Sequence, residues 1–305
     1  FARASRLALR GLLALSPNTR RRNRRDIARH YDLGNAFFEA FLDETMTYSS
    51  GVFERPDATL AEASTAKYER LCKMLELRPS HRVLEIGCGW GGFATYAAET
   101  YGCSVVATTI SAEQYAYSRE RVRSAGLEDR VQIIQQDYRD LTGTFDRIAS
   151  IEMIEAVGHD QLGTYVKTLS DRLTEDGLAA LQAITIADQN YEQARTTVDF
   201  IKKHIFPGSF IPSVGAISEA VASNGNLRLI GLADYGLHYA ETLDRWCRRF
   251  QAKADAIRAM GFPDSFLRSW EYYFRYCEGG FRERYLSVAQ LALAKPRHEP
   301  RLAHA

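Results

Sequence analysis

Four glycines that directly follow a short apolar run are the first residues in this chain that indicate chemistry. The run is Val83–Ile86, and the glycines are Gly87, Gly89, Gly91 and Gly92. Glycine lets the backbone turn tightly and lets a ligand approach without a Cβ atom in the way. The run is typical of a buried parallel strand, and Phe93–Tyr101 predicts a helix whose first N–H groups face the same ligand. The pattern therefore predicts a ligand site at a strand-to-helix turn.

The spacing of these glycines indicates which ligand the turn binds. Gly87, Gly89 and Gly91 do not give the G-x-G-x-x-G spacing of a dinucleotide site. Together with Glu85 they form E-x-G-x-G-x-G, which resembles motif I of S-adenosylmethionine (SAM)-dependent methyltransferases. A simple strand-to-helix turn is the competing interpretation. We expect Glu85 and the three glycines to contact SAM.

Two further stretches offer polar groups to a bound SAM molecule. The second expected strand has no acidic residue at its end, so Thr109 and Gln114 are the candidates to bond the ribose hydroxyls. Asp137, Tyr138 and Arg139 follow the third strand, where side chains can meet the adenine ring and its amine. Asp137 could instead simply cap the next turn.

Strands and helices alternate along most of the chain. The expected later strands are Ser104–Ile110, Val131–Gln135, Phe145–Ile151, Leu178–Ile186, Leu227–Ala233 and Val288–Ala294. The other expected helices are Arg24–Leu42, Thr59–Leu75, Ala112–Ala125, Asp160–Leu173, Val214–Asn224, Tyr239–Met260 and Pro263–Arg284. This order predicts an α/β protein with a parallel sheet, whose ligand lies beyond the carboxyl ends of the strands. The aromatic-rich stretch Ala187–Pro212 breaks the pattern and is expected to be irregular.

Composition and charge narrow the class of protein further. The 305 residues are 46% hydrophobic and 25% charged, which suits a globular α/β protein with a full core. Five scattered cysteines without a C-x-x-C pair argue against structural zinc and disulfides and suit a reducing cytoplasm. No apolar run approaches the ~20 residues of a membrane-spanning helix. We expect no metal site and no nucleic-acid partner.

Nine arginines and one acidic residue, Asp26, lie in the first 29 residues, among several leucines. Such a basic amphipathic segment can lie on an anionic membrane surface. It could equally be part of a helix that packs on an upstream segment, because the chain begins at Phe1 rather than at methionine. We therefore expect a cytoplasmic protein that associates peripherally with the membrane.

Five longer motifs indicate a particular family of SAM-dependent methyltransferases, because they occur here in the same order as in that family. They are HYDLGNAFFEAFLDETMTYSSGVFE, VLEIGCGWGGFA, IEMIEAVGH, FIKKHIFPGSFIP and HYAETLDRW. Together they resemble the cyclopropane fatty acid synthase family, from about His30 to the C-terminus. The resemblance implies SAM-dependent methylation of the cis double bond of unsaturated phospholipid acyl chains. It also implies a Rossmann-like methyltransferase sheet with N-terminal helices and a helical acyl-channel insertion, and a homodimer is possible.

The resemblance divides the chain into an arm and a methyltransferase domain. Residues 1–29 are the basic arm and linker, and residues 30–305 are the domain. Within the domain, the expected parts are N-terminal cap helices (30–81), the SAM-binding core (82–186), the lipid-channel insertion (187–226) and the remaining strands and helices (227–305).

The resemblance also implies further site residues. Tyr48 and Ser49 join the SAM contacts. A bicarbonate ion is the implied general base, held by Glu155, Tyr239 and the backbone around Ile184. Two positions depart from the family pattern, because Ser50 replaces a cysteine and Gln182 replaces a histidine. Both still offer hydrogen bonds to a bicarbonate oxygen.

A base is needed because methyl transfer to an alkene leaves a carbocation, which must lose a proton before a ring closes. Glu155 could orient the base or serve as the base itself. The competing interpretation is an acid placed at a helix N-terminus because the dipole favours it there. For the whole chain, the alternatives to cyclopropane formation are methyl-branched fatty acids, N-methylation of a small amine, and SAM binding without catalysis.

Overall fold

Seven strands form one sheet within residues 33–299, the part of the chain that the computed structural model describes. Their order across the sheet is β3-β2-β1-β4-β5-β7-β6. The strands are β1 (Arg82–Ile86), β2 (Ser104–Thr109), β3 (Val131–Gln135), β4 (Phe145–Ile151), β5 (Leu173–Ile186), β6 (Arg228–Asp234) and β7 (Leu286–Ala294). The predicted α/β class is confirmed, and β3 and β4 have the predicted bounds.

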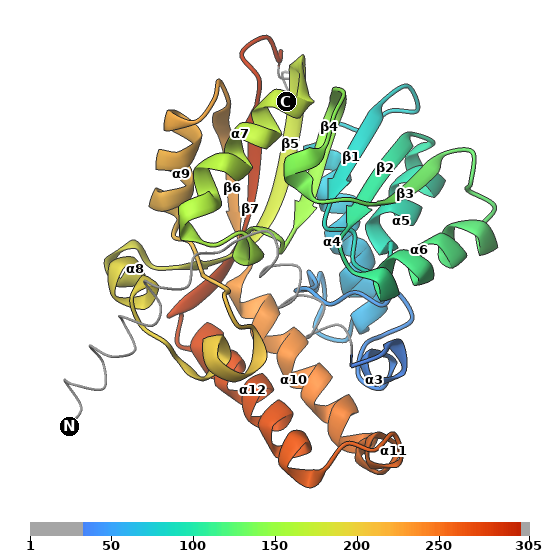
Figure 1. The fold of residues 1–305 in the computed structure, drawn as a ribbon, viewed down its shortest axis with the longest axis vertical. Helices are drawn as coiled ribbons and strands as arrows, with labels where there is room; N and C mark the ends of the chain where they lie inside the picture. Colours follow the sequence, from blue (N-terminus) through green and yellow to red (C-terminus); the bar gives the residue numbers. More distant parts are fainter. Residues whose placement is uncertain (1–32, 300–305) are drawn as a thin grey trace.

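The sheet is parallel only in part, which corrects the prediction of a parallel sheet. Strands β1 to β5 pair in parallel, whereas β7 runs antiparallel to both β5 and β6. The cause lies in the segment between β6 and β7. Its helices extend beyond the end of the sheet and return, instead of crossing a sheet face, so the chain re-enters in the opposite direction (Figure 1).

Ten α-helices and four shorter helical turns connect these strands in the described residues. The α-helices are α3 (Asn35–Glu39), α4 (Leu60–Met74), α5 (Gly92–Tyr101), α6 (Ala112–Ser124), α7 (Leu162–Arg172), α8 (Asp188–Arg195), α9 (Val214–Ser223), α10 (Gly236–Ala252), α11 (Ala254–Ala259) and α12 (Asp264–Arg282). The 3-10 turns are η1 (Tyr138–Asp140), η2 (Ile154–Ala156) and η3 (His159–Gln161), and η4 (Ile201–Ile205) is a π-helix.

Three helix predictions need correction. The stretch expected to be irregular contains α8 and η4. The single helix expected over Tyr239–Met260 is two, because the chain leaves the helical conformation at Lys253. Of the helix expected over Arg24–Leu42, only α3 is present among the described residues, and Gly34 with a φ of 87° precedes it. The basic arm, residues 1–29, lies outside the described residues.

Side chains from the two faces of the sheet pack into separate clusters. Val83 of β1 packs with α4 and α5, whereas its neighbour Leu84 packs with Tyr165 and Leu169 of α7. This alternation follows from the two-residue period of a strand. A capping box between Thr59 and Glu62 begins α4, with both reciprocal hydrogen bonds present. The sheet is therefore covered on both faces, and its strand ends are held in place.

A third, aromatic cluster joins the N-terminal segment to the helices beyond the sheet. Phe37 of α3 lies 4.7 Å from Trp270 of α12 between ring centroids, and Phe41 lies 5.3 Å from Phe274. Trp246 of α10 belongs to the same buried cluster. This packing holds the loop after α3 next to the carboxyl ends of the parallel strands.

Candidate active site

A cavity of about 710 Å³ lies at the carboxyl ends of the parallel strands. Thirteen of the sixteen predicted site residues line it: Tyr48, Ser49, Glu85, Gly87, Gly89, Thr109, Gln114, Asp137, Tyr138, Arg139, Glu155, Ile184 and Tyr239. The other three, Ser50, Gln182 and Gly91, do not line it. The position of the cavity agrees with the general rule for ligands of open α/β sheets.

The glycine turn contributes an open wall to this cavity. Gly87, Gly89 and Gly91 all have left-handed φ angles, of 84°, 52° and 82°. A Cβ atom on Gly89 would meet no atom within 4 Å, whereas one on Gly87 would lie 2.9 Å from Met153. A Cβ atom on Gly91 would lie 3.1 Å from Ser118. Gly89 therefore leaves space for a ligand, and Gly91 is needed for packing rather than for contact.

Polar groups around the turn are arranged for a ligand with hydroxyl and amine groups. Oε2 of Glu85 is buried and has no hydrogen-bond partner among the described residues. Burial raises the pKa of this carboxyl to about 8. Thr109 donates its hydroxyl hydrogen to Oε1 of Gln114 over 2.9 Å. An orphaned acid beside an open glycine turn fits the polar part of SAM.

Asp137 caps the turn after β3, and its contact with the adenine ring stays a prediction. It caps η1 by accepting a hydrogen bond from the Arg139 N–H over 3.0 Å, and it also lines the cavity. The Arg139 guanidinium donates to both Asp137 oxygens, over 2.8 and 2.6 Å. The cap therefore fixes a charged pair at the edge of the cavity.

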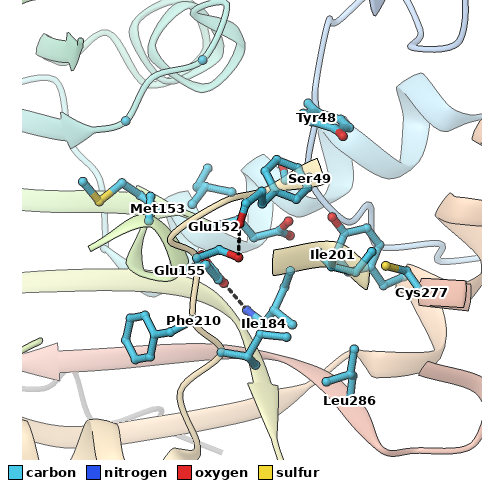
Figure 2. Close-up of a pocket in the computed structure, with 18 of the residues that line it drawn as sticks. Tyr48, Ser49, Glu152, Met153, Glu155, Ile184, Ile201, Phe210, Cys277 and Leu286 are labelled. Carbon is cyan, nitrogen blue, oxygen red and sulfur yellow. Dashed lines mark hydrogen bonds between the residues drawn. The ribbon is translucent and has the colours of Figure 1, made fainter. Parts of the chain in front are cut away.

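Two carboxyl groups lie together in the loop after β4, and the sequence analysis identified only Glu155 (Figure 2). The other is Glu152, whose Oε1 accepts hydrogen bonds of 2.8 Å from the Ser50 backbone N–H and from Nε2 of Gln182. The Tyr239 hydroxyl also bonds to Glu152. Glu152 and Glu155 both lie in the motif IEMIEAVGH. The presence of a second acid at the strand end could therefore have identified Glu152 from the sequence.

Glu155 has a different environment from Glu152. Its Oε1 accepts a hydrogen bond of 2.5 Å from the Ile184 N–H (Figure 2), and its buried Oε2 has no partner among the described residues. Burial, and then the charge of Glu152, raise the pKa of Glu155 to about 8. Burial also raises the pKa of Glu152, but Lys67 and the three hydrogen-bond donors oppose that rise. The shared charge therefore belongs on Glu152, and Glu155 carries a proton at neutral pH.

Lys67 is a second polar residue that the sequence analysis missed. It lies on the buried face of α4 with no exposed surface, and its Nζ donates to the Ser49 hydroxyl over 2.5 Å. Burial lowers the pKa of Lys67 to about 8, against the charges of Glu152, Asp43 and Glu85. Apolar periodicity predicts only which apolar residues of a helix are buried, so it could not have identified Lys67 as a buried cation.

The groups expected to hold a bicarbonate ion are engaged with the protein. Nε2 of Gln182 also bonds to the Ser50 carbonyl, over 3.1 Å, and the Ser50 hydroxyl bonds to the Gly51 carbonyl. The Ile184 N–H is taken by Glu155. These donors therefore converge on two glutamates instead of on open space.

The opposite side of the cavity is apolar. The stretch after β5 contributes Ile201, Phe206 and Phe210, and α12 contributes Tyr273 and Cys277. The Phe210 N–H bonds to the Glu155 carbonyl over 3.0 Å, which ties this wall to the acidic loop. The two acids and the apolar side chains Ile201, Phe210 and Cys277 lie around the same cavity (Figure 2), which the glycine turn also lines.

Residues 33–299 contain neither a cluster of metal ligands nor a membrane-spanning helix. No group of three or more metal-ligating side chains occurs in that part of the chain. No helix there is long and apolar enough to cross a membrane.

Comparison with known proteins places the chain in a family. The family model for mycolic acid cyclopropane synthetase matches residues 18–291. Tuberculostearic acid methyltransferase UfaA1 of Mycobacterium tuberculosis is 41% identical over 91% of this chain and 66% of its own length. Cyclopropane-fatty-acyl-phospholipid synthase of Escherichia coli K12 is 39% identical over 87% of this chain and 66% of its own length. The chain thus spans about two thirds of these two relatives.

Solved structures agree with this placement. The cyclopropane synthase MmaA2 from Mycobacterium tuberculosis matches with a TM-score of 0.84 and 31% identity, over 89% of this chain and 98% of that one. Mycolic acid cyclopropane synthase CmaA1, solved with SAH and CTAB, matches with the same TM-score, identity and coverage. The chain belongs to the mycolic acid cyclopropane synthetase family, and its fold is that of the SAM-dependent methyltransferases.

Proposed function

We propose that this protein transfers the methyl group of SAM to the cis double bond of an unsaturated phospholipid acyl chain and forms a cyclopropane ring. One observation carries the proposal: a half-buried acidic pair, Glu152 and Glu155, lies where an open glycine turn meets an apolar chamber. Such an arrangement brings together a methyl donor, an alkene and a proton acceptor.

The glycine turn and its polar neighbours are proposed to bind SAM. Gly89 leaves room for the donor, and Glu85 offers an unpaired oxygen to a positively charged or hydrogen-bonding group. Thr109 and Gln114, which bond to each other, are proposed to bond the ribose hydroxyls, and the charged pair of Asp137 and Arg139 is proposed to meet the adenine edge. Tyr48 and Ser49 close the same side. SAM supplies an electrophilic methyl group when bound.

The apolar chamber is proposed to hold the acyl chain. An alkene is a weak nucleophile, so it must be aligned with the methyl group and kept from water. The resulting cation would be trapped by water but tolerates aromatic faces such as those of Phe206 and Tyr273. The chamber therefore supports chemistry on a hydrocarbon rather than on a hydrated amine.

Loss of one proton completes the reaction, and the acidic cluster is proposed to receive it. Bicarbonate is the base that the family resemblance implies, with Glu155, Tyr239 and Ile184 beside it. All three border the cavity. Methylation of a small amine also releases a proton, so the apolar chamber, rather than the acids, is what favours the alkene substrate.

A methyl-branched product is the second candidate. The same cation can lose its proton to give a branched alkene, and one relative at 41% identity is by name a tuberculostearic acid methyltransferase. Both products gain one CH₂ unit. We therefore propose expressing the protein in a host that makes unsaturated but no cyclopropane lipids. Mild catalytic hydrogenation before mass spectrometry adds two hydrogens to a branched alkene and none to a cyclopropane.

Peripheral association with an anionic membrane is also proposed. Tyr276 and Tyr285 line the cavity and are 43% and 47% exposed, and Tyr272 stacks on Tyr276. Tyrosine suits a membrane–water boundary because its ring is apolar and its hydroxyl is polar. An acyl chain could thus enter the cavity from the bilayer, with the basic arm adding charge attraction.

A further inference from the structure

We infer that the Glu152 carboxylate takes the place of the bicarbonate ion and that this protein carries its own proton acceptor. The inference rests on the proposed function, since it assigns the base of that reaction. It makes the enzyme independent of dissolved carbonate.

The hydrogen bonds around Glu152 carry this inference. Three residues expected to surround the ion, Ser50, Gln182 and Tyr239, all donate to this one side chain. A carboxylate and a bicarbonate both present a planar pair of oxygens, so the same donors suit either anion. Glu152 also lines the cavity, so the proton acceptor remains accessible from the chamber.

A second glutamine, Gln290, lies behind Gln182 and bonds to its amide oxygen. Nε2 of Gln290 donates to Oε1 of Gln182 over 2.9 Å, and both side chains are buried. The Ser50 carbonyl can only accept a hydrogen bond, so the NH₂ group of Gln182 lies on the side of Ser50 and Glu152 and donates to both. An oriented donor of this kind specifies an acceptor at that position.

The backbone of Glu152 is held in an unusual conformation. Its φ is 50°, in the left-handed region that non-glycine residues seldom adopt, and its N–H bonds to the Gln182 carbonyl over 2.7 Å. This conformation costs about 1–3 kcal/mol and persists only where the surrounding structure holds the residue in place. The strain places the carboxylate among its donors.

The chemistry balances with Glu152 as the acceptor. The methyl carbon bonds to one alkene carbon as its bond to sulfur breaks, and the other alkene carbon becomes a cation. An ionised Glu152 oxygen then takes a proton from the transferred methyl group. The electron pair of that C–H bond closes the ring, and the carboxylic acid later releases its proton to water. Lys67 and the three donors favour the ionised form that this step requires.

Chemical rescue tests the inference. Glu152→Gly suits the left-handed backbone and opens space among the same donors for a small anion. In carbonate-free buffer, the wild type should turn over unsaturated phospholipid vesicles at its full rate. Glu152→Gly should lose roughly 10²–10⁴-fold in rate and recover with added sodium bicarbonate, but not with equal sodium chloride. Glu54→Gly, at an exposed loop carboxylate, is the matched control and should show neither effect.

Binding of the anion is a second readout that does not require turnover. Calorimetric titration with sodium bicarbonate should give binding to Glu152→Gly and none to the wild type. A wild type that needs bicarbonate for turnover, or that binds it in calorimetry, overturns the inference. A wild type with no activity on any unsaturated lipid, together with bicarbonate binding only by Glu152→Gly, would refute the proposed function and leave the anion site assigned.

Discussion

At the scale of single residues, the charge state of the site depends on Lys67. Its side chain is fully buried. Among the groups that lower the pKa of Glu152 against the effect of burial, Lys67 has the largest influence. The charge of this buried cation favours the ionised form of Glu152. The second carboxyl, on Glu155, can then stay protonated and bonded to the Ile184 N–H.

Lys67→Met should therefore shift the pH dependence of catalysis. Methionine keeps the apolar stem and removes the charge. Without that charge the pKa of Glu152 rises, so the pH at which the rate reaches half its plateau should increase by roughly 1 unit. The profile of kcat/KM against pH measures this, with SAM affinity as the check that the site is intact. An unchanged profile would show that Lys67 does not set the charge of the base.

Glu155→Gln should change how stability depends on pH. The folded-state pKa of Glu155 is about 8, above the unfolded value of 4.5, so folding favours its protonated form. Its contribution to stability is complete below the unfolded pKa and is lost as pH rises toward 8. Each pH unit in that interval lowers the free energy of unfolding by about 1.4 kcal/mol. Glutamine cannot ionise. In thermal denaturation, the stability of the variant relative to that of the wild type should therefore increase as the pH rises from 5 to 8. Parallel curves would mean that Glu155 is ionised in the fold.

At the scale of elements, the glycine turn can be tested with two matched glycines. Gly89 and Gly126 have left-handed φ angles of 52° and 66°, and a Cβ atom on either would meet nothing within 4 Å. Only Gly89 lines the cavity. Alanine at either position should therefore cost a similar roughly 1–2 kcal/mol of stability.

Gly89→Ala should, in addition, weaken SAM binding about tenfold or more, because its methyl group occupies ligand space. Gly126→Ala should bind SAM like the wild type. Isothermal titration calorimetry with SAM compares the two variants. Equal affinities would place the SAM site away from the turn.

Local sequence predicted the elements well where local patterns govern them. The apolar runs of β3 and β4 report burial directly, so their bounds were predictable. The end of α10 at Ala252 is not marked by glycine or proline, so the break before α11 has no local signal. The direction of β7 depends on where the helices after β6 pack, which is a long-range property.

The sequence predicted where the candidate site lies, but not the hydrogen bonds that join its residues. Strand ends, the glycine turn and the family resemblance together identified thirteen residues that line one cavity. The role of Glu152 depends on donors from three distant segments, carried by Ser50, Gln182 and Tyr239. No spacing within the motif reveals that convergence, and the resemblance directed attention to Glu155 alone.

At the scale of the whole molecule, the cavity has a tyrosine-rich mouth that suits a bilayer. Tyr276→Ser combined with Tyr285→Ser should weaken sedimentation with anionic phospholipid vesicles about tenfold, since less apolar area is buried in the bilayer. The effect should persist at high salt. SAM affinity should not change.

Two other exposed apolar residues provide the control. Ile230 and Leu232 lie on edge strand β6, are 49% and 48% exposed, and do not line the cavity. Ile230→Ser with Leu232→Ser should leave vesicle binding unchanged. Deletion of residues 1–25 should remove the salt-sensitive part of binding. Equal losses in both serine pairs would mean that the cavity mouth is not the membrane-facing surface.

The most direct test of the account follows the fate of the transferred methyl group. The purified protein is incubated with SAM bearing a fully deuterated methyl group and with vesicles of a cis-unsaturated phospholipid, and the lipids are analysed by mass spectrometry. The account predicts a product that retains two of the three deuterons, because one leaves with the proton taken by the acidic site. A saturated phospholipid should gain none. Retention of all three deuterons would contradict proton loss from the transferred methyl group, and absence of label from the unsaturated lipid would contradict methyl transfer to a double bond.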